Sequence, residues 1–241
     1  MTQPSFDWLN PGLAPGVDCL VTNRLAGRRG DFNLATHAGD QARVLENREI
    51  VLRALGGGET QWLNQVHGAE CIYCDRVTAV PPDADAAWTD RDQISLALLT
   101  ADCVPVLLAS RDGSLVGVAH AGWQGLVKGV LENLVTSLPS KAADLVAWIG
   151  PCIGQAHYEV GEAVWRCFAQ AYLAPHSNPS KRLLDLAGVA EGQLTQLGVG
   201  EVRRADQCVF DNDRFYSHRA TGQKGRPEGR FASVIVRRRN C

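Results

Sequence analysis

Three side chains that can bind a transition metal lie in short motifs at the ends of apolar stretches. They are His67, Cys103 and His120. Two imidazoles and one thiolate suit Zn²⁺ or copper, because these ions prefer nitrogen and sulfur ligands. Three protein ligands also leave a fourth coordination position open to water or substrate, which a catalytic zinc requires. The wide spacing of the three matches no compact zinc-finger pattern, so a metal site depends on the fold bringing them together.

Two glycine-bearing turns follow expected strands and lead into expected helix starts. The first carries Gly122 and Gln124, and the second spans residues 150–154. Backbone N–H groups at such helix starts can bind anions, and glycine lets the backbone come close; the glycines equally serve the turns alone. Neither turn matches a P-loop or a dinucleotide fingerprint, so ATP and NAD are disfavoured as ligands.

The composition is that of an ordinary globular protein. The 241 residues are 45% apolar and 21% charged, and the net charge of −2 gives no reason to expect nucleic acid or an anionic membrane as a partner. The N-terminal segment lacks the pattern of a secretory signal, and no stretch has the roughly 18 apolar residues of a membrane span. We therefore expect a cytoplasmic protein whose eight cysteines stay reduced.

Hydrophobic patterning predicts a mixture of helices and strands without strict alternation. This favours an α+β fold with mixed β-sheets covered by helices, in a single domain over residues 1–241. Helices are expected at residues 40–55, with Asp40 as N-cap, and at 124–138, 160–172 and 183–197. Strands are expected at residues 62–66, 70–77, 94–100, 104–109, 115–120, 145–149 and 231–236.

Five motifs together resemble one known family. In chain order they are FNLATHAGD at 32–40, NQVHG at 64–68, TADCVPVLL at 100–108, GVAHAGWQGL at 117–126 and IGPCIG at 149–154. The series resembles the YfiH-type laccase-domain family over roughly residues 24–236. Members of that family are described both as multicopper polyphenol oxidases and as purine nucleoside phosphorylases.

The resemblance implies a four-layer α/β/β/α fold with one metal, usually zinc, held by His67, Cys103 and His120. It also implies phosphorolysis of adenosine, inosine and methylthioadenosine, together with deamination of adenosine. The expected partners are then purine nucleosides and phosphate. A role in peptidoglycan fidelity is attributed to some members. The oligomeric state is not implied.

One segment departs from the family pattern. Members resemble Thr-Arg-x-Gly-Gly-Val-Ser before the Asn-Leu-x-x-His motif, whereas this chain keeps Arg24, Asn33 and His37 but lacks the paired glycines and the serine. That segment is expected to border the site. The candidate substrate-binding residues are Arg24, Asn33, Gly122 and Gln124.

An open metal position suggests how the reactions would run. Water activated there could attack C6 of adenosine, giving inosine and ammonia. Phosphate could attack the ribose C1′ as the glycosidic bond loosens, with the metal or a basic residue such as Arg24 positioning the phosphate. The candidate catalytic residues are Cys103, His37 as acid, base or substrate contact, and Asp102. Asp102 could support a ligand or accept a proton, but a strand-end carboxylate can equally cap backbone N–H groups.

Three alternatives remain open. Cys103 could be a nucleophile with His120 as its base, in a hydrolase acting on an amide or a cell-wall precursor. A copper-dependent phenol oxidase would need a trinuclear cluster, for which the six histidines of the chain are too few. A non-catalytic cell-wall accessory protein with a structural metal would need a fourth protein ligand, and none is evident near the motifs.

Overall fold

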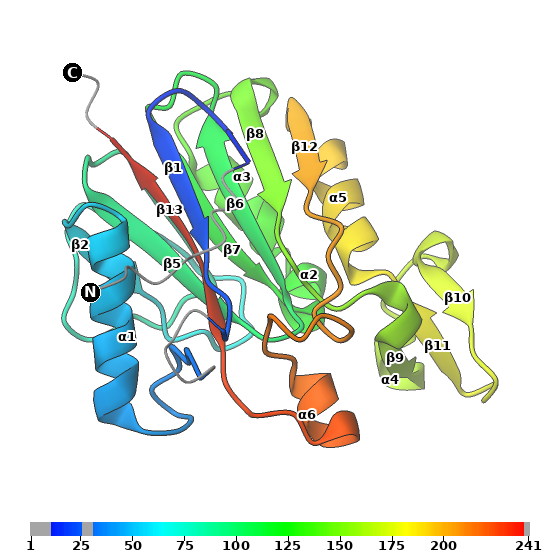
Figure 1. The fold of residues 1–241 in the computed structure, drawn as a ribbon. Helices are drawn as coiled ribbons and strands as arrows, with labels where there is room; N and C mark the ends of the chain where they lie inside the picture. Colours follow the sequence, from blue (N-terminus) through cyan, green and yellow to red (C-terminus); the bar gives the residue numbers. More distant parts are fainter. Residues whose placement is uncertain (1–10, 26–30, 239–241) are drawn as a thin grey trace.

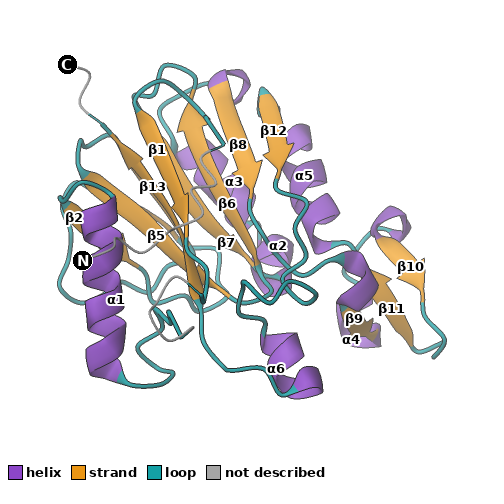
Figure 2. Ribbon diagram, viewed as in Figure 1, coloured by secondary structure: helices purple, strands orange, loops and turns teal. Residues whose placement is uncertain are grey.

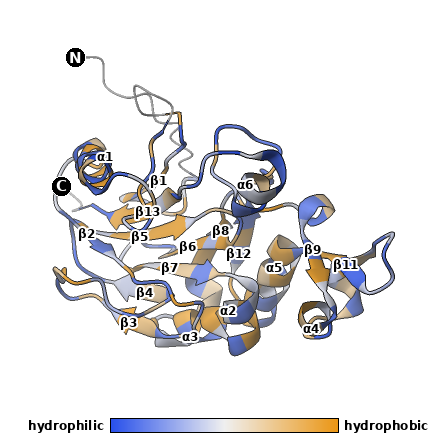
Figure 3. Cartoon of the chain, turned by 90° about the horizontal axis from the view of Figure 1, so that it is seen from below, coloured by the Kyte–Doolittle hydropathy of each residue, from blue (hydrophilic) through white to orange (hydrophobic). Residues whose placement is uncertain are grey.

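Two β-sheets lie face to face at the centre of the protein, with helices on their outer faces (Figure 1). The structure, a computed structural model, describes residues 11–25 and 31–238. Figure 3 looks along the layers and shows α1 on one side, then the two sheets, then α2, α3 and α5 on the other side. The predicted α+β class with four α/β/β/α layers is therefore confirmed.

The first sheet has four strands in the order β1-β13-β5-β2. The strand β13 is antiparallel to β1 and β5, whereas β2 is parallel to β5. The helix α1 covers its outer face, and the Asp40 side chain caps that helix as predicted by accepting from the N–H of Ala42 at 3.0 Å. The bounds are β1 Val17–Val21, α1 Gln41–Ala54, β2 Glu59–Trp62, β5 Ile94–Thr100 and β13 Phe231–Arg237.

The second sheet has six strands in the order β12-β8-β6-β7-β4-β3. Only the two outermost pairs, β12 with β8 and β3 with β4, are parallel. All residues of β6, β7 and β8 are buried, which explains the nearly continuous apolar sequence of these strands. The bounds are β3 Cys71–Tyr73, β4 Ala86–Thr89, β6 Val104–Ser110, β7 Val116–Ala121, β8 Leu145–Ile149 and β12 Glu201–Arg204.

Three hydrophobic clusters fill the three spaces between the layers. One cluster joins α1 to the first sheet and contains Val51 and Val234. A second lies between the sheets, where Leu96 and Val118 belong to the same group. A third joins the second sheet to its covering helices and includes Leu134. Both sheets are thus buried on both faces, which is why their strands lack a simple apolar–polar alternation.

The helix expected at residues 124–138 is two helices. The helix α2 spans Trp123–Lys128 and α3 spans Val130–Ser137, with Gly129 between them at a φ of 85°. A left-handed residue ends the first helix, and glycine is the residue type that adopts this conformation without steric cost. The sequence pattern missed the break because both pieces bury apolar residues on the same sheet.

The prediction of one helix over residues 160–172 is wrong in most of its length. That segment forms β9 and the four-residue α4, and β9 joins β10 and β11 in a small sheet of order β10-β11-β9 at the periphery (Figure 2). The helix expected from residue 183 starts at residue 186, because Asp185 caps it by accepting from the N–H of Gly188 at 2.8 Å. The bounds are β9 Glu159–Gly161, α4 Glu162–Trp165, β10 Leu173–Pro175, β11 Lys181–Leu184 and α5 Leu186–Gln196.

The chain crosses between the two large sheets at the places where two candidate ligands lie. His67 lies in the connection from β2 to β3, and Cys103 lies in the three-residue connection from β5 to β6. The strand predicted at 62–66 in fact ends at Trp62, which leaves His67 in this connection. The last helix, α6, spans His218–Lys224 and lies beside the same end of the sheets. Among the described residues, no helix has the length and apolar character to span a membrane.

Candidate metal centre

The fold brings the three predicted metal ligands together. The ligand atoms of His67, Cys103 and His120 all lie within 4.8 Å of one another, and the Cys103 Sγ is 3.9 Å from the His67 Nε2. The two imidazole rings meet edge to face with their centroids 4.9 Å apart. His120 comes from β7, where it pairs with Pro105 of β6, so this ligand is fixed by the sheet. The donor set and its spacing fit a single Zn²⁺ or copper ion.

A fully buried carboxylate supports two of these ligands. Asp85 has no exposed surface, and its Oδ1 lies 2.7 Å from the Nδ1 of His120. The same carboxylate accepts from the backbone N–H groups of Val66, His67 and Gly68 at 3.1, 3.1 and 2.6 Å. Because Nδ1 of His120 is engaged, its Nε2 is the nitrogen left for a metal. Burial raises the pKa of Asp85, but the hydrogen bonds from His120 and Gly68 outweigh it, so the pKa is lowered.

Two of the site residues have backbone conformations that residues other than glycine seldom adopt. His67 has a φ of 55° and Asp102 a φ of 120°. The carbonyl of His67 accepts from the Lys128 Nζ at 2.8 Å, so the strained loop is held from α2 as well as by Asp85. A Cβ on Gly122 would lie 3.0 Å from the Cys103 Sγ and 3.1 Å from the His67 Cδ2. Glycine at this position therefore leaves room for the two ligands to approach.

The electrostatics of the site favour a thiolate at Cys103. Burial raises the pKa of this thiol, but His120 and His67 outweigh that effect and lower the pKa to about 6. In the same way burial lowers the pKa of His120, whereas Cys103 and Asp85 raise it, to about 9. A cysteine that is deprotonated at neutral pH is ready to bind a metal.

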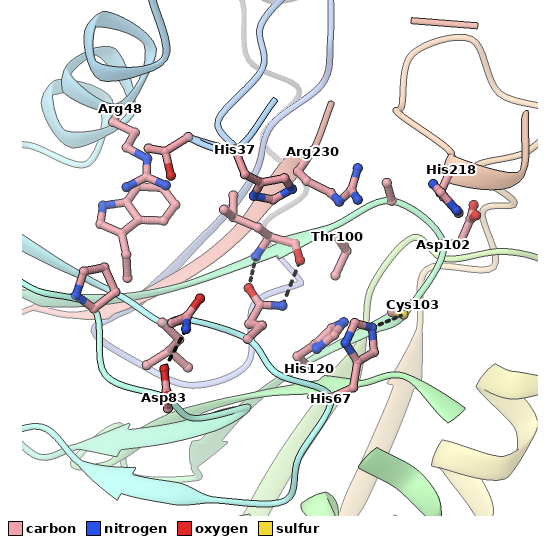
Figure 4. A pocket seen from close by; sticks show the side chains of 18 of the residues that line it. His37, Arg48, His67, Asp83, Thr100, Asp102, Cys103, His120, His218 and Arg230 are labelled. Atoms are coloured by element: carbon pink, nitrogen blue, oxygen red, sulfur yellow. Dashed lines mark hydrogen bonds between the residues drawn. The ribbon is translucent and has the colours of Figure 1, made fainter. Parts of the chain in front are cut away.

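The three ligands lie at one side of a cavity of about 1060 Å³ (Figure 4). This volume is at the upper end of the usual range for small-molecule sites. Apolar and aromatic side chains form part of the wall, among them Trp62, Leu63 and Leu99. The polar and charged residues of the lining are Thr36, His37, Arg48, Asn64, Gln65, Thr78, Asp83, Thr100, Asp102, Tyr158, His218, Arg219 and Arg230, together with the three ligands.

Two of the predicted catalytic residues line this cavity besides Cys103. The exposed His37 has no hydrogen bond to any residue that the structure describes. Asp102 is half-buried, and both of its oxygens are engaged: Ser217 Oγ donates to Oδ1 at 2.6 Å and the N–H of Arg219 donates to Oδ2 at 2.7 Å. The carboxylate of Asp102 thus holds the start of α6, which is the capping alternative. Its catalytic role stays a prediction.

The four predicted substrate-binding residues are not among those that line the cavity. The Arg24 Nε donates to the carbonyl of Asp213. The Asn33 side chain ties together the turn at residues 33–38 by accepting from the N–H of Ala35 and donating to its carbonyl. Gly122 provides space beside the ligands, and Gln124 is partly buried at the start of α2. Direct substrate contact by these residues stays a prediction, and residues 26–30 of the departing segment lie outside the described residues.

Sequence reasoning missed one residue that supports the candidate ligands and two that line the cavity. Asp85 was hidden because it stands in a loop far from His120 in the chain; the available signal was a lone carboxylate within the apolar segment 84–87. Arg230 was overlooked because it directly precedes the last strand and no neighbouring motif drew attention to it. Tyr158 also lines the wall, and burial raises the pKa of its hydroxyl group well above the usual range.

A second group of possible ligands is present among the described residues. His157, Cys208 and Asp211 also have ligand atoms within 4.8 Å of one another. Here the His157 Nε2 already pairs with the Asp211 Oδ2 at 2.5 Å, and Lys224 is 3.4 Å from the other oxygen of Asp211. The nearby ammonium opposes a divalent cation, so the group around Cys103 is the stronger candidate.

Comparison with known proteins decides the family. The family model described as multi-copper polyphenol oxidoreductase laccase matches residues 18–238. The chain belongs to this laccase-domain family. It is 35% identical to a purine nucleoside phosphorylase of Pseudomonas aeruginosa over 95% of this chain and 97% of that protein. It is also 35% identical to the purine nucleoside phosphorylase YfiH of Escherichia coli, over 91% of this chain and 93% of that one. A crystal structure of a Neisseria meningitidis protein is similar, with a TM-score of 0.88, 33% identity and coverage of 97% and 98%.

Proposed function

We propose that this protein is a zinc-dependent purine nucleoside phosphorylase that also deaminates adenosine. Its proposed substrates are adenosine, inosine and methylthioadenosine, with phosphate as the second substrate. The observation that carries the proposal is the convergence of His67, Cys103 and His120 at the wall of a large cavity. The names of the curated relatives, which span nearly the whole chain, support the same activity. We also propose that the enzyme is cytoplasmic, where its cysteines would stay reduced.

The metal site fits an ion with an open position. His67, Cys103 and His120 would hold it, and a bound zinc ion would supply positive charge that polarises water or substrate. Asp85 keeps His120 in the orientation and tautomer that present Nε2 to the ion. Gly122 and the Lys128 contact to the His67 carbonyl keep the ligands in place.

The cavity wall offers separate surfaces for the parts of a nucleoside. The flat apolar faces of a purine can pack on Trp62, Leu63 and Leu99. The imidazole of His37, which has no hydrogen-bond partner among the described residues, can contact the substrate or transfer a proton to it. In phosphorolysis a phosphate oxygen forms a bond to the ribose C1′ while the bond from C1′ to the purine nitrogen breaks. The electron pair of that bond leaves with the base, which then takes a proton.

A direct assay tests this proposal. Zinc-loaded protein is incubated with adenosine and phosphate, and the products are separated by chromatography. Adenine with ribose 1-phosphate indicates phosphorolysis, whereas inosine with ammonia indicates deamination. Cys103→Ala and chelation should each abolish turnover, while a matched variant of an exposed cysteine, Cys167→Ala, should not. Turnover unchanged by Cys103→Ala would exclude the proposed site.

A cysteine hydrolase is the second candidate, because the pKa of Cys103 is lowered to about 6 beside two histidines. In this case the thiolate attacks an amide carbonyl, as in other cysteine nucleophile enzymes. Metal content separates the two functions. Rapid alkylation of Cys103 in zinc-loaded protein would favour the nucleophile, whereas zinc protection of the thiol favours the nucleoside enzyme.

The family description also keeps a copper-dependent polyphenol oxidase as an alternative. The group around Cys103 contains two histidines, and the second group, around Cys208, contains one. A laccase transfers electrons through a trinuclear copper cluster that needs many more histidine ligands. Copper-loaded protein is therefore expected to oxidise phenols slowly or not at all. Copper-dependent phenol oxidation faster than nucleoside turnover would reverse this assignment.

A further inference from the structure

Among the described residues, three arginines line the cavity, and their hydrogen bonds distinguish them. Arg48 donates from Nε and Nη2 to the carbonyl of Leu34 at 3.0 and 2.9 Å. Arg219 donates from Nη1 and Nη2 to the carbonyls of His157 and Glu159 at 3.1 and 3.0 Å. In both side chains protein carbonyls occupy an edge of the guanidinium that could otherwise hold an anion with two parallel N–H groups.

Arg230 keeps such an edge free. Its Nη1 donates to the carbonyl of the neighbouring Gly229 at 2.8 Å, and its Nε and Nη2 make no hydrogen bond to any residue in the described part of the chain. The edge formed by Nε and Nη2 has the geometry for bidentate pairing with two oxygens of a phosphate. No carboxylate in the described ranges forms an ion pair with Arg230, so its charge is available to a ligand.

Arg230 lies beside His37 on one wall of the cavity, and a hydrogen bond joins the two segments that carry them. Figure 4 shows Arg230 beside His37, with His218 farther along this wall and the metal ligands on the other side of the cavity. The Asn33 Oδ1 accepts from the backbone N–H of Arg230 at 2.9 Å, and the same side chain braces the turn that carries His37. Two segments distant in the sequence are thereby held together before any ligand binds.

Neighbouring polar groups also suit an anion. Thr100 lies opposite Phe231 in the strand register and lines the cavity, and its buried Oγ1 has no hydrogen-bond partner among the described residues. The two carboxylates in the lining are engaged elsewhere: Asp83 accepts from the Asn64 Nδ2 at 2.6 Å, and Asp102 holds the start of α6. Neither neutralises Arg230, so this part of the wall is electropositive.

We propose that Arg230 binds the phosphate co-substrate, with His37 and His218 flanking the anion. This inference rests on the proposed phosphorylase function and specifies where its second substrate lies. The ribose would then lie between Arg230 and the metal ligands, which places an oxygen of the held phosphate toward C1′. It replaces the sequence-based assignment of phosphate to Arg24, whose Nε is bound to the Asp213 carbonyl.

The test measures phosphate binding and catalysis separately in zinc-loaded protein. Titration calorimetry with inorganic phosphate gives a dissociation constant without nucleoside, and initial rates give the KM for phosphate. Arg230→Gln should weaken phosphate binding about 10- to 100-fold, as expected for loss of a charge-assisted bidentate pair. The phosphate affinity of Arg230→Lys should lie between those of the wild type and Arg230→Gln, because a lysine keeps the charge and loses the paired N–H groups.

Two controls keep the result interpretable. Arg76→Gln removes the same charge from an exposed position outside the cavity lining and should leave phosphate affinity unchanged. Phosphate binding that is lost in Arg24→Gln and kept in Arg230→Gln would overturn the assignment. Phosphate-dependent nucleoside cleavage with an unaltered phosphate KM in Arg230→Gln would also overturn it while leaving the proposed function intact. Phosphate binding that depends on Arg230, without nucleoside cleavage, would support the anion site and reject the phosphorylase.

Discussion

The Oδ1 of Asp85 lies 2.7 Å from the Nδ1 of His120, and both side chains are buried. The same carboxylate accepts from three backbone N–H groups of the loop that carries His67. One side chain therefore fixes the ring of one ligand and the backbone of another. Hydrogen bonds of this kind behind the ligands raise metal affinity, because ligands that are already oriented lose less entropy on binding.

Replacing Asp85 by Asn should weaken zinc binding about 10- to 100-fold, the usual effect of losing a carboxylate behind a ligand histidine. The amide has one acceptor oxygen in place of two, so its NH2 group must face some of the N–H groups that the carboxylate held. It also lacks the negative charge that faces His120. Zinc affinity measured by competition with a chromogenic chelator checks this. The matched control is Asp75→Asn at an exposed position, which should bind zinc like the wild type. Equal zinc affinity in the two variants would show that Asp85 does not support the ligand.

The thiol of Cys103 should react as a thiolate in metal-free protein down to about pH 6. His120 and His67 lower its pKa to about 6, so the thiolate fraction is high at pH 7 and falls as the pH drops through that value. Burial raises the pKa of Cys71 to about 11, so this residue should label slowly at pH 7. Iodoacetamide labelling between pH 4 and 9, followed by peptide mass spectrometry, gives both profiles. Zinc should suppress labelling of Cys103 alone, and a labelling midpoint near pH 9 would contradict the proposed environment.

Gly122→Ala should impair the metal site more than the fold. The added Cβ would lie 3.0 Å from the Cys103 Sγ and 3.1 Å from the His67 Cδ2, so the two ligands must move apart. We expect zinc affinity to fall at least tenfold and nucleoside turnover to fall with it. Gly222→Ala in α6 is the matched control, because no atom lies within 4 Å of its added Cβ. Zinc affinity in Gly122→Ala equal to that of this control would be inconsistent with the crowding.

Much of the centre of the molecule could be predicted from the sequence. The short apolar runs at residues 94–100 and 104–109 gave the right strands because both sheets are buried on both faces. The helix after Asp40 was predictable because its cap and apolar face are local features. The candidate metal ligands were recognisable from their donor chemistry and their motifs, although their convergence depends on chain crossings between sheets that no local pattern reveals.

The remaining features depend on contacts between distant segments. Asp85 meets His120 because β4 pairs with β7, and Arg230 meets the turn of His37 through the Asn33 side chain and the Leu34 N–H. The segment at residues 160–172 has helical periodicity, yet β9 pairs with β11 and removes its first residues from any helix. Pairing energy from another strand outweighs local helix propensity in such a case.

The break between α2 and α3 allows a stability test at a position outside the cavity lining. Gly129 has a φ of 85°, where an alanine is strained by about 1 kcal/mol or more. Gly129→Ala should therefore lower the melting temperature by about 2–4 °C for a chain of this size. In Gly222→Ala, whose glycine has no positive φ, the alanine should leave the melting temperature unchanged or raise it. Scanning calorimetry of both zinc-loaded variants makes the comparison. An unchanged melting temperature in Gly129→Ala would mean that residues 124–138 can form the continuous helix that the sequence pattern predicts.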